Sequence, residues 1–182
     1  MELFIETSLA DLYFAIIDNE KIVDELHVKD LVKKTDYFYD GLNQLLKNSK
    51  VKINNFSKIY TTTGPGSFSG TRIGFLFAKT ISQISNIKLF LSPTYNLFLT
   101  QKQLLNEKNL TIRIKANKYN IYEIKTHPSF SCNLIENHNN FDILDYQLLK
   151  NHISQYLLNF HEVDDVSDVD LQYFHNPQIG GQ

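Results

Sequence analysis

The residues best suited to chemistry lie in one glycine-rich segment, Thr61 to Gly74, which reads TTTGPGSFSGTRIG. An apolar, strand-like run, Phe56 to Thr62, enters the segment, and an apolar-periodic run, Ile73 to Ile84, leaves it. Glycine lets a backbone take positive φ or approach another group closely, and amides at a helix start can hold an anion. The segment therefore predicts a tight strand-to-helix turn that serves either as an anion cradle or as a close packing contact. The residues of this turn motif are Gly64, Pro65, Gly66, Ser67, Phe68, Gly70 and Arg72.

The two common phosphate-binding motifs do not fit this turn. A P-loop needs a lysine directly after its last glycine, and here Gly70 is followed by Thr71. A dinucleotide fingerprint needs G-x-G-x-x-G; Gly64 and Gly66 fit it, but Ser69 stands at the third glycine position. The spacing favours a packed glycine turn over a nucleotide-binding loop.

Other catalytic and metal-binding patterns are also missing. The turn lacks the G-x-S-x-G spacing of a nucleophile elbow, so Ser67 or Ser69 fits better as the N-cap of the next helix. No two histidines are four residues apart, as a zinc-binding H-E-x-x-H helix requires. We therefore expect no catalytic residue, no metal and no cofactor. The single cysteine, Cys132, excludes a disulfide within the chain and suits a reducing cytoplasm.

Composition limits the possible classes of function. The 182 residues, 42% of them hydrophobic, suffice for one domain core or two small lobes. The net charge of −2 argues against a protein that binds nucleic acid by itself, because such proteins usually carry a basic excess. No signal peptide is evident, and no apolar run approaches the roughly 20 residues of a membrane helix. We expect a cytoplasmic protein without membrane contact.

The helix that follows the turn has two distinct apolar features. One is a row of small residues at four-residue spacing. The other is a broad apolar stripe that one buried face would explain, made of Ile73, Leu76, Phe77, Ile81 and Ile84. Phe75 lies outside the stripe, which leaves two readings: the helix is covered on two sides within the fold, or a partner helix covers the second side. The pattern favours the partner. The expected interface residues are Gly70, Gly74, Phe75, Ala78, Lys79, Ser82, Tyr37 and Tyr39.

The elements expected along the chain form an α/β pattern. Before residue 106 the strands are Glu2–Glu6, Asp11–Ile17, Ile22–Val28, Phe56–Thr62 and Lys88–Leu91. The helices there are Asp30–Lys47, capped by Asp30, then Gly70–Ser85 and Pro93–Asn106. Beyond a polar break the strands are Leu110–Asn117, Tyr119–Thr126 and Phe130–Ile135, followed by the helix Asp145–Phe160. An acidic stretch, Glu162–Asp170, fits a solvated connection and leads to the segment Leu171–Phe174.

This element order suggests duplicated lobes, as in the actin-like ATPase (ribonuclease-H-like) fold. A first lobe is expected over residues 1–106 and a shortened second lobe over 107–176. Residues 177–182 are expected to form a flexible tail. An element order says little about function by itself.

In its order of elements and its glycine turn, the sequence resembles the bacterial TsaB (YeaZ) family. The resemblance rests on the opening strand LFIETS, the turn GPGSFSGTRIG and the later segment SPTYNLF, and it is good to about Thr100. Beyond that point, TIRIKANKYNIYEI is similar to the family's second-lobe hairpin and LQYF to its closing strand.

The resemblance implies an accessory role in tRNA modification. Family members help to install threonylcarbamoyl on the adenosine beside the anticodon. They do so as non-catalytic partners of the TsaD subunit, together with the small ATPase TsaE. The resemblance also implies pairing through first-lobe helices, as homodimer or heterodimer, and contact with tRNA only through the complex.

Two departures from the family pattern bear on an enzymatic alternative. Glu6 stands where the family usually has Asp in the first strand, and Lys115 stands where it has Asp in the second-lobe hairpin. Active members of the superfamily use such carboxylates to hold Mg²⁺ and a nucleotide. The alternative function is a nucleotide-dependent phosphotransferase of the actin-like superfamily. The glycine turn favours this alternative, whereas Glu6 and Lys115 disfavour it.

Overall fold

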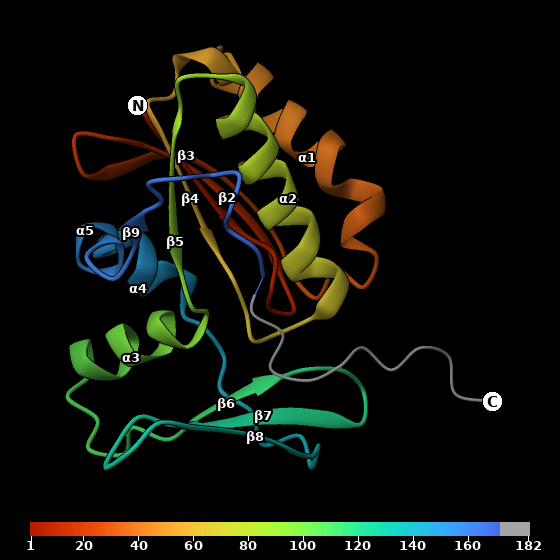
Figure 1. The fold of residues 1–182 in the computed structure, drawn as a ribbon, viewed down its shortest axis with the longest axis vertical. Helices are drawn as coiled ribbons and strands as arrows, with labels where there is room; N and C mark the ends of the chain where they lie inside the picture. Colours follow the sequence, from red (N-terminus) through yellow and green to blue (C-terminus); the bar gives the residue numbers. More distant parts are fainter. Residues whose placement is uncertain (172–182) are drawn as a thin grey trace.

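A six-stranded mixed sheet organises the computed structural model, which describes residues 1–171 (Figure 1). Its strands are β1 (Glu2–Glu6), β2 (Leu12–Asp18), β3 (Lys21–Val28), β4 (Lys58–Thr62), β5 (Lys88–Ser92) and β9 (His161–Glu162). Their order is β3-β2-β1-β4-β5-β9, with β1, β4 and β5 parallel. Strands β1 and β2 are buried along almost their whole length, which requires cover on both faces of the sheet.

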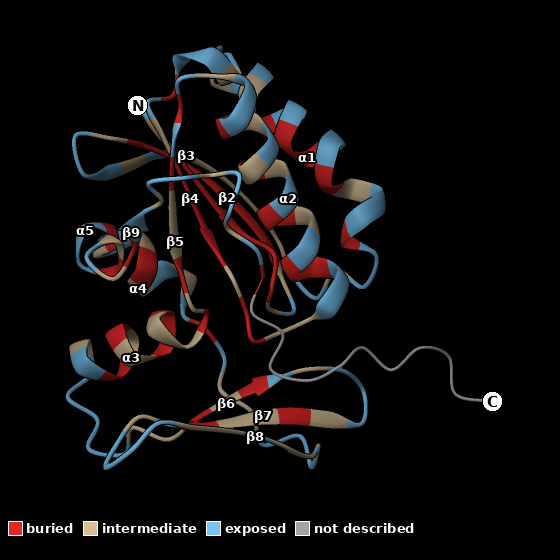
Figure 2. Ribbon diagram, in the orientation of Figure 1, coloured by how far each residue is buried: buried red, intermediate tan, exposed pale blue. Residues whose placement is uncertain are grey.

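Helices supply that cover and create a core on each face (Figures 1 and 2). One face carries α1 (Lys34–Asn48) and α2 (Phe68–Ile84). The other carries α3 (Tyr95–Leu104), α4 (Tyr146–Asn151) and α5 (Ile153–Leu157). The alternation of side chains along β1 divides the two cores, because Leu3 and Ile5 pack under α1 and α2 while Phe4 packs on the opposite face. A short 3₁₀ turn, η1 (Ile53–Asn55), precedes β4.

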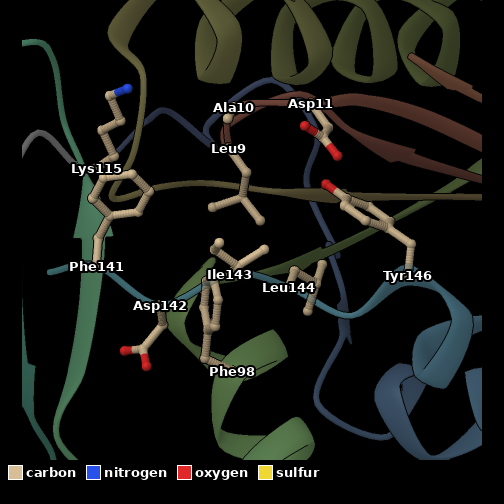
Figure 3. A pocket seen from close by; sticks show the side chains of 10 residues that line it. All are labelled: Leu9, Ala10, Asp11, Phe98, Lys115, Phe141, Asp142, Ile143, Leu144 and Tyr146. Carbon is tan, nitrogen blue, oxygen red and sulfur yellow. The ribbon is translucent and has the colours of Figure 1, made fainter. Parts of the chain in front are cut away.

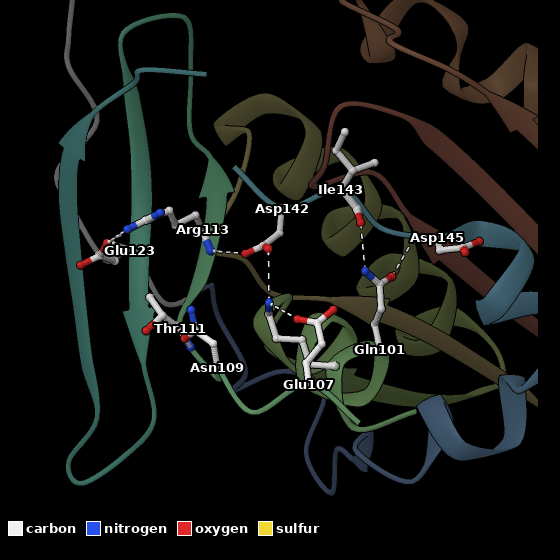
Figure 4. Close-up of polar contacts among 10 residues, drawn as sticks. Gln101, Glu107, Asn109, Thr111, Arg113, Glu123, Asp142, Ile143 and Asp145 are labelled. Atoms are coloured by element: carbon white, nitrogen blue, oxygen red, sulfur yellow. Dashed lines mark hydrogen bonds and ion pairs between the residues drawn. The ribbon is translucent and has the colours of Figure 1, made fainter. Parts of the chain in front are cut away.

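A second, three-stranded antiparallel sheet lies beyond α3 and contains β6 (Ile112–Lys115), β7 (Asn120–Lys125) and β8 (Ser131–Glu136). Polar contacts tie it to the rest of the molecule (Figure 4). The backbone amide of Arg113 donates to Asp142 Oδ2 at 2.7 Å. The ammonium of Lys102, on α3, lies 3.4 Å from Asp142 Oδ1 and 2.9 Å from Glu107 Oε2. Asp142 therefore joins the small sheet to α3.

The order of elements matches the sequence prediction as far as β8, but strand β9 was not predicted and several ends differ. Helix α1 begins at Lys34 rather than Asp30, because Asp30 has φ +50° and its amide donates to Asp11 instead. The helix expected over 145–160 is broken at His152, whose φ of −127° and ψ of 27° are not helical. Ser67 caps α2, as expected, by accepting a hydrogen bond from Gly70 N.

The division into two lobes stays a prediction. Within the range 107–176, α4 packs near β3 and β9 pairs with β5, so both contribute to the large sheet's surroundings. The closing strand Leu171–Phe174, apart from Leu171, and the tail 177–182 lie outside the described residues. In the part of the chain that the structure describes, no helix has both the length and the apolarity to cross a membrane.

Candidate functional site

The glycine turn between β4 and α2 packs against the loop that follows β1. The amide of Ser67 donates to Ser8 O at 2.7 Å, and the hydroxyl of Thr7 donates to Gly70 O at 2.7 Å. A Cβ atom at Gly66 would overlap Ser8 O, and one at Gly70 would overlap Thr7 O. The glycines therefore allow two backbones to meet, which favours the packing interpretation over the anion cradle.

Glu6, at the end of β1, is fully buried and holds this loop in place. Its Oε1 accepts hydrogen bonds from Ser8 N and Ser8 Oγ, both at 2.6 Å, and from Leu9 N at 3.1 Å. Its Oε2 accepts one from Thr62 Oγ1 at 2.7 Å. Burial raises the pKa of Glu6, and these hydrogen bonds oppose that rise. Both oxygens of the carboxylate are thus engaged within the protein.

Lys115 is the last residue of β6 and lines the same pocket as Leu9 and Ala10 (Figure 3). Its ammonium lies 5.3 Å from the centre of the Phe141 ring, a cation–π contact. A charged lysine has no lone pair with which to ligate a metal. No group of three His, Cys, Asp or Glu side chains suited to a metal occurs within residues 1–171. A magnesium ion, which the superfamily implies, therefore does not fit the residues at these two positions.

Helix α2 buries a different face from the one expected. Its small residues face the protein's own sheet, where a Cβ atom at Gly74 would overlap Thr7 Oγ1. Gly70, Gly74, Phe75, Ala78 and Ser82, which were expected to face a partner, are all buried within the chain. The physical reason is close packing, because a helix that lies tightly on strands needs small side chains as much as one that meets another helix.

The acidic segment after β9 covers another side of α2. The ammonium of Lys79, also expected to face a partner, donates to Val169 O at 2.6 Å and to Ser167 O at 3.3 Å. Val163 and Val166 pack with Val169 against the core beneath α1 and α2. The stretch from Glu162 to Asp170, expected to be a solvated connection, is in part a packed cover.

The apolar stripe of α2, expected to be its buried face, instead borders a groove between α1 and α2. The groove has a volume of about 520 Å³. Leu76 is 48% exposed and Tyr39 is 59% exposed, whereas the ring of Phe77 packs 5.2 Å from that of Phe38. The lining residues are Thr35, Tyr39, Phe68, Ser69, Arg72, Ile73, Leu76, Phe77, Thr80 and Ile81.

Of the expected interface residues, Tyr39 alone lines this groove. Tyr37, two residues before Tyr39, is half-buried, and its hydroxyl donates a hydrogen bond to Gln44 Oε1 at 3.0 Å. Two members of the turn motif, Phe68 and Arg72, also line it, with the guanidinium 5.1 Å from the ring centre. The apolar stripe was the sequence signal for the groove. It was expected to be the buried face of α2, whereas in the fold it borders the groove.

Comparison with known proteins gives related sequences. A family model for TsaD, described as tRNA N6-adenosine threonylcarbamoyltransferase, matches residues 38–133. TsaB of Buchnera aphidicola, a tRNA threonylcarbamoyladenosine biosynthesis protein, is 32% identical over 98 residues, which are 53% of this chain and 44% of that protein. An uncharacterised MG208 homolog of Mycoplasma pneumoniae is 32% identical over 117 residues, 59% of this chain and 60% of that protein. The chain thus spans less than two thirds of these relatives.

Solved structures show the same fold. YeaZ from Pseudomonas aeruginosa superposes with a TM-score of 0.58, covering 80% of this chain and 71% of that one, at 12% identity. A second Pseudomonas aeruginosa chain, described as similar to peptidase YEAZ, gives a TM-score of 0.57 over 79% and 70% of the two chains. Together with the family match, they confirm the actin-like ATPase fold predicted from the element order.

Proposed function

Because the chain belongs to the TsaB (YeaZ) family of TsaD-like proteins, we propose that it is the non-catalytic partner of a TsaD-type catalytic subunit. In this proposal the pair modifies the adenosine beside the anticodon of tRNA with threonylcarbamoyl, and a TsaE-type ATPase acts with it. The chain meets tRNA only through the complex, in the cytoplasm. The role of the Buchnera relative in threonylcarbamoyladenosine biosynthesis supports this assignment.

The observation that carries the proposal is the apolar groove between α1 and α2. Leu76 exposes 48% of its surface on α2, and Tyr39, which is 59% exposed, lines the same groove from α1. Contiguous exposed apolar surface of this kind is typical of a protein-docking site. The region that matches the TsaD model includes α2 and most of α1, so a TsaD-type subunit carries a similar helix pair. Two such pairs can pack face to face.

The non-catalytic part of the proposal rests on Glu6 and Lys115. Both oxygens of Glu6 already accept hydrogen bonds from the chain, and Lys115 offers an ammonium where a metal site would need an oxygen ligand. These features support a scaffold over the alternative phosphotransferase.

The test is co-purification of the chain with the TsaD subunit of the same organism. Leu76→Glu places a charge in the centre of the groove and should weaken the pair about ten-fold or more, because an apolar contact is lost and a carboxylate must be desolvated. Binding is measured by calorimetry. Threonylcarbamoyladenosine formed by the reconstituted complex is measured in parallel.

Leu158→Glu is the matched control, because Leu158 is 79% exposed, follows α5 and does not line the groove. This variant should bind TsaD as the unchanged chain does. If Leu76→Glu binds equally well, the groove is not the pairing surface. If the chain forms only a homodimer that Leu76→Glu dissociates, the surface is right but the partner is wrong.

A further inference from the structure

The α1–α2 groove has one charged side chain, Arg72, among the described residues that line it. Arg72 is the fifth residue of α2, which begins at Phe68, so it lies toward the N-terminal end of the groove wall. The other lining side chains are apolar, aromatic or neutral hydroxyl groups. A single positive charge therefore marks one end of a surface that is otherwise uncharged.

This guanidinium has no carboxylate partner within residues 1–171, although its side chain is held in a defined place. It lies 5.1 Å from the centre of the Phe68 ring, a cation–π contact. Helix α2 contains no acidic residue, so no neighbour one turn away can pair with Arg72. The chain's other arginine, Arg113, is by contrast paired with Glu123 at 2.9 Å.

The position of Arg72 is electrostatically unfavourable in the chain by itself. The N-terminal end of a helix carries partial positive charge, and the first turn of α2 has no acidic residue to offset it. Arg72 adds a full positive charge in the second turn. A carboxylate brought from outside would be favoured by the guanidinium and by the helix dipole together.

The choice of arginine points the same way. All basic residues of the chain except Arg72 and Arg113 are lysines. Arginine is less strongly hydrated than lysine, stacks on aromatic rings and offers a planar fork that matches a carboxylate, which makes it the usual cation at protein interfaces. A lysine would serve equally well for solubility alone.

On the premise of the proposed pairing with a TsaD-type subunit, we propose that Arg72 determines the specificity of that pairing by binding an aspartate or glutamate of the TsaD-type subunit. The fork of the guanidinium donates two parallel hydrogen bonds to the carboxylate. Apolar contacts alone let a partner helix slide or reverse, whereas one ion pair at one end of the groove fixes its direction and register. The partner is thus a helix pair whose apolar surface ends in a carboxylate.

The charge favours this partner over a second copy of the chain. The groove of a second copy would bring no carboxylate in its own lining. Two copies packed groove to groove would therefore leave both Arg72 side chains unpaired at the contact, which is costly when they lose water.

The first test is calorimetry of the full chain with the TsaD subunit of the same organism, at about 50 mM and about 500 mM sodium chloride. Arg72→Met should raise the Kd about ten-fold at the lower salt and remove most of its salt dependence. Arg72→Lys should fall between the two, because the charge stays and the fork is lost. The Tm of each variant should stay unchanged, because Arg72 is exposed.

Lys21→Met is the matched control, because Lys21 is an exposed cation at the start of β3 and does not line the groove. It should keep the Kd and the salt dependence of the unchanged chain. If Arg72→Met behaves like this control, Arg72 binds no carboxylate of the partner.

Charge exchange identifies the partner residue. Arg72→Glu should abolish pairing, and changing each Asp or Glu of the corresponding TsaD helices to Arg, one at a time, should restore it at one position. Failure of every such variant to restore binding would refute the proposal. An effect of Arg72→Glu on self-association alone, measured by analytical ultracentrifugation, would assign the carboxylate to a second copy and would also refute it.

Leu76→Glu separates this inference from the proposed function. If Leu76→Glu weakens the pair and the Arg72 variants do not, the groove is the pairing surface and the role of Arg72 is wrong. If neither position affects binding, the groove itself is wrong.

Discussion

Two opposing effects act on the charge of the Glu6 carboxylate. Burial disfavours the charged form, whereas four hydrogen bonds favour it. Its pKa is raised above 4.5, so the folded chain takes up this proton more readily than the unfolded chain. The stability that follows is fully present below pH 4.5 and is lost as the pH rises through the folded pKa. The side chain is therefore a structural acceptor that fits the fold best at acidic pH.

Two substitutions separate the charge of Glu6 from its acceptor role. Relative to Glu6→Gln, the unchanged chain should lose free energy of unfolding between pH 4 and pH 8, as measured by urea denaturation. Glu6→Ala should cost about 1–3 kcal/mol at pH 4, because the buried amide of Ser8 loses its acceptor, and this cost should become smaller as the pH rises through the raised pKa of Glu6. A constant difference between Glu and Gln across this range would show that the pKa is not raised.

At the scale of elements, α2 depends on glycine where it meets the loop after β1. Gly70→Ala should destabilise the chain by about 1–3 kcal/mol, because the new Cβ overlaps a backbone oxygen, Thr7 O, that cannot move aside. This cost exceeds the gain of about 1 kcal/mol that alanine brings to a helix. Urea denaturation at neutral pH measures the difference.

Gly41→Ala is the matched control in α1. Its Cβ would lie 3.0 Å from the ring of Tyr37, a partly exposed side chain that can turn away. The variant should be neutral or up to about 1 kcal/mol more stable. If both variants were equally harmless, the close approach of α2 would be wrong.

The same helix shows where prediction from sequence ended. The spacing of small and apolar residues predicted that α2 is a helix with two distinct faces. Ser67 or Ser69 was expected as its N-cap, and in the structure the cap is Ser67. Which face meets the sheet depends on Thr7 and Thr61, which are remote in sequence and contact Gly74 only in the fold. Similarly, Asp30 has the right chemistry for a cap, but its amide is taken by Asp11.

At the scale of the whole molecule, Lys102 links the small sheet to the rest. Desolvation acts against its charge, but hydrogen bonding and attraction from Glu107 and Asp142 outweigh it and raise its pKa. Lys102→Met should leave Asp142 without this partner and cost about 1–3 kcal/mol. Hydrogen exchange should increase over β6 to β8 and stay low over β1 and β4.

Lys108→Met, at an exposed neighbouring position, is the control and should leave both exchange patterns unchanged. Equal acceleration in the two sheets after Lys102→Met would mean that they unfold as one unit.

The groove could not have been predicted from the sequence. It joins Tyr39 of α1 to Leu76 of α2 across many intervening residues. Local spacing identifies each element, whereas this surface depends on how helices and strands pack. The resemblance supplied the family and the fold, and packing supplied the site.

The edge strands of the large sheet govern how copies of this chain can aggregate. One edge strand, β3, bears charged side chains such as Asp24 and Glu25, which disfavour pairing with a strand of another chain. The other is shielded by only two residues, His161 and Glu162, lying on Phe90 and Leu91 of β5. Removing the chain from residue 161 onward would expose a mostly apolar edge strand, β5, of the kind that promotes aggregation.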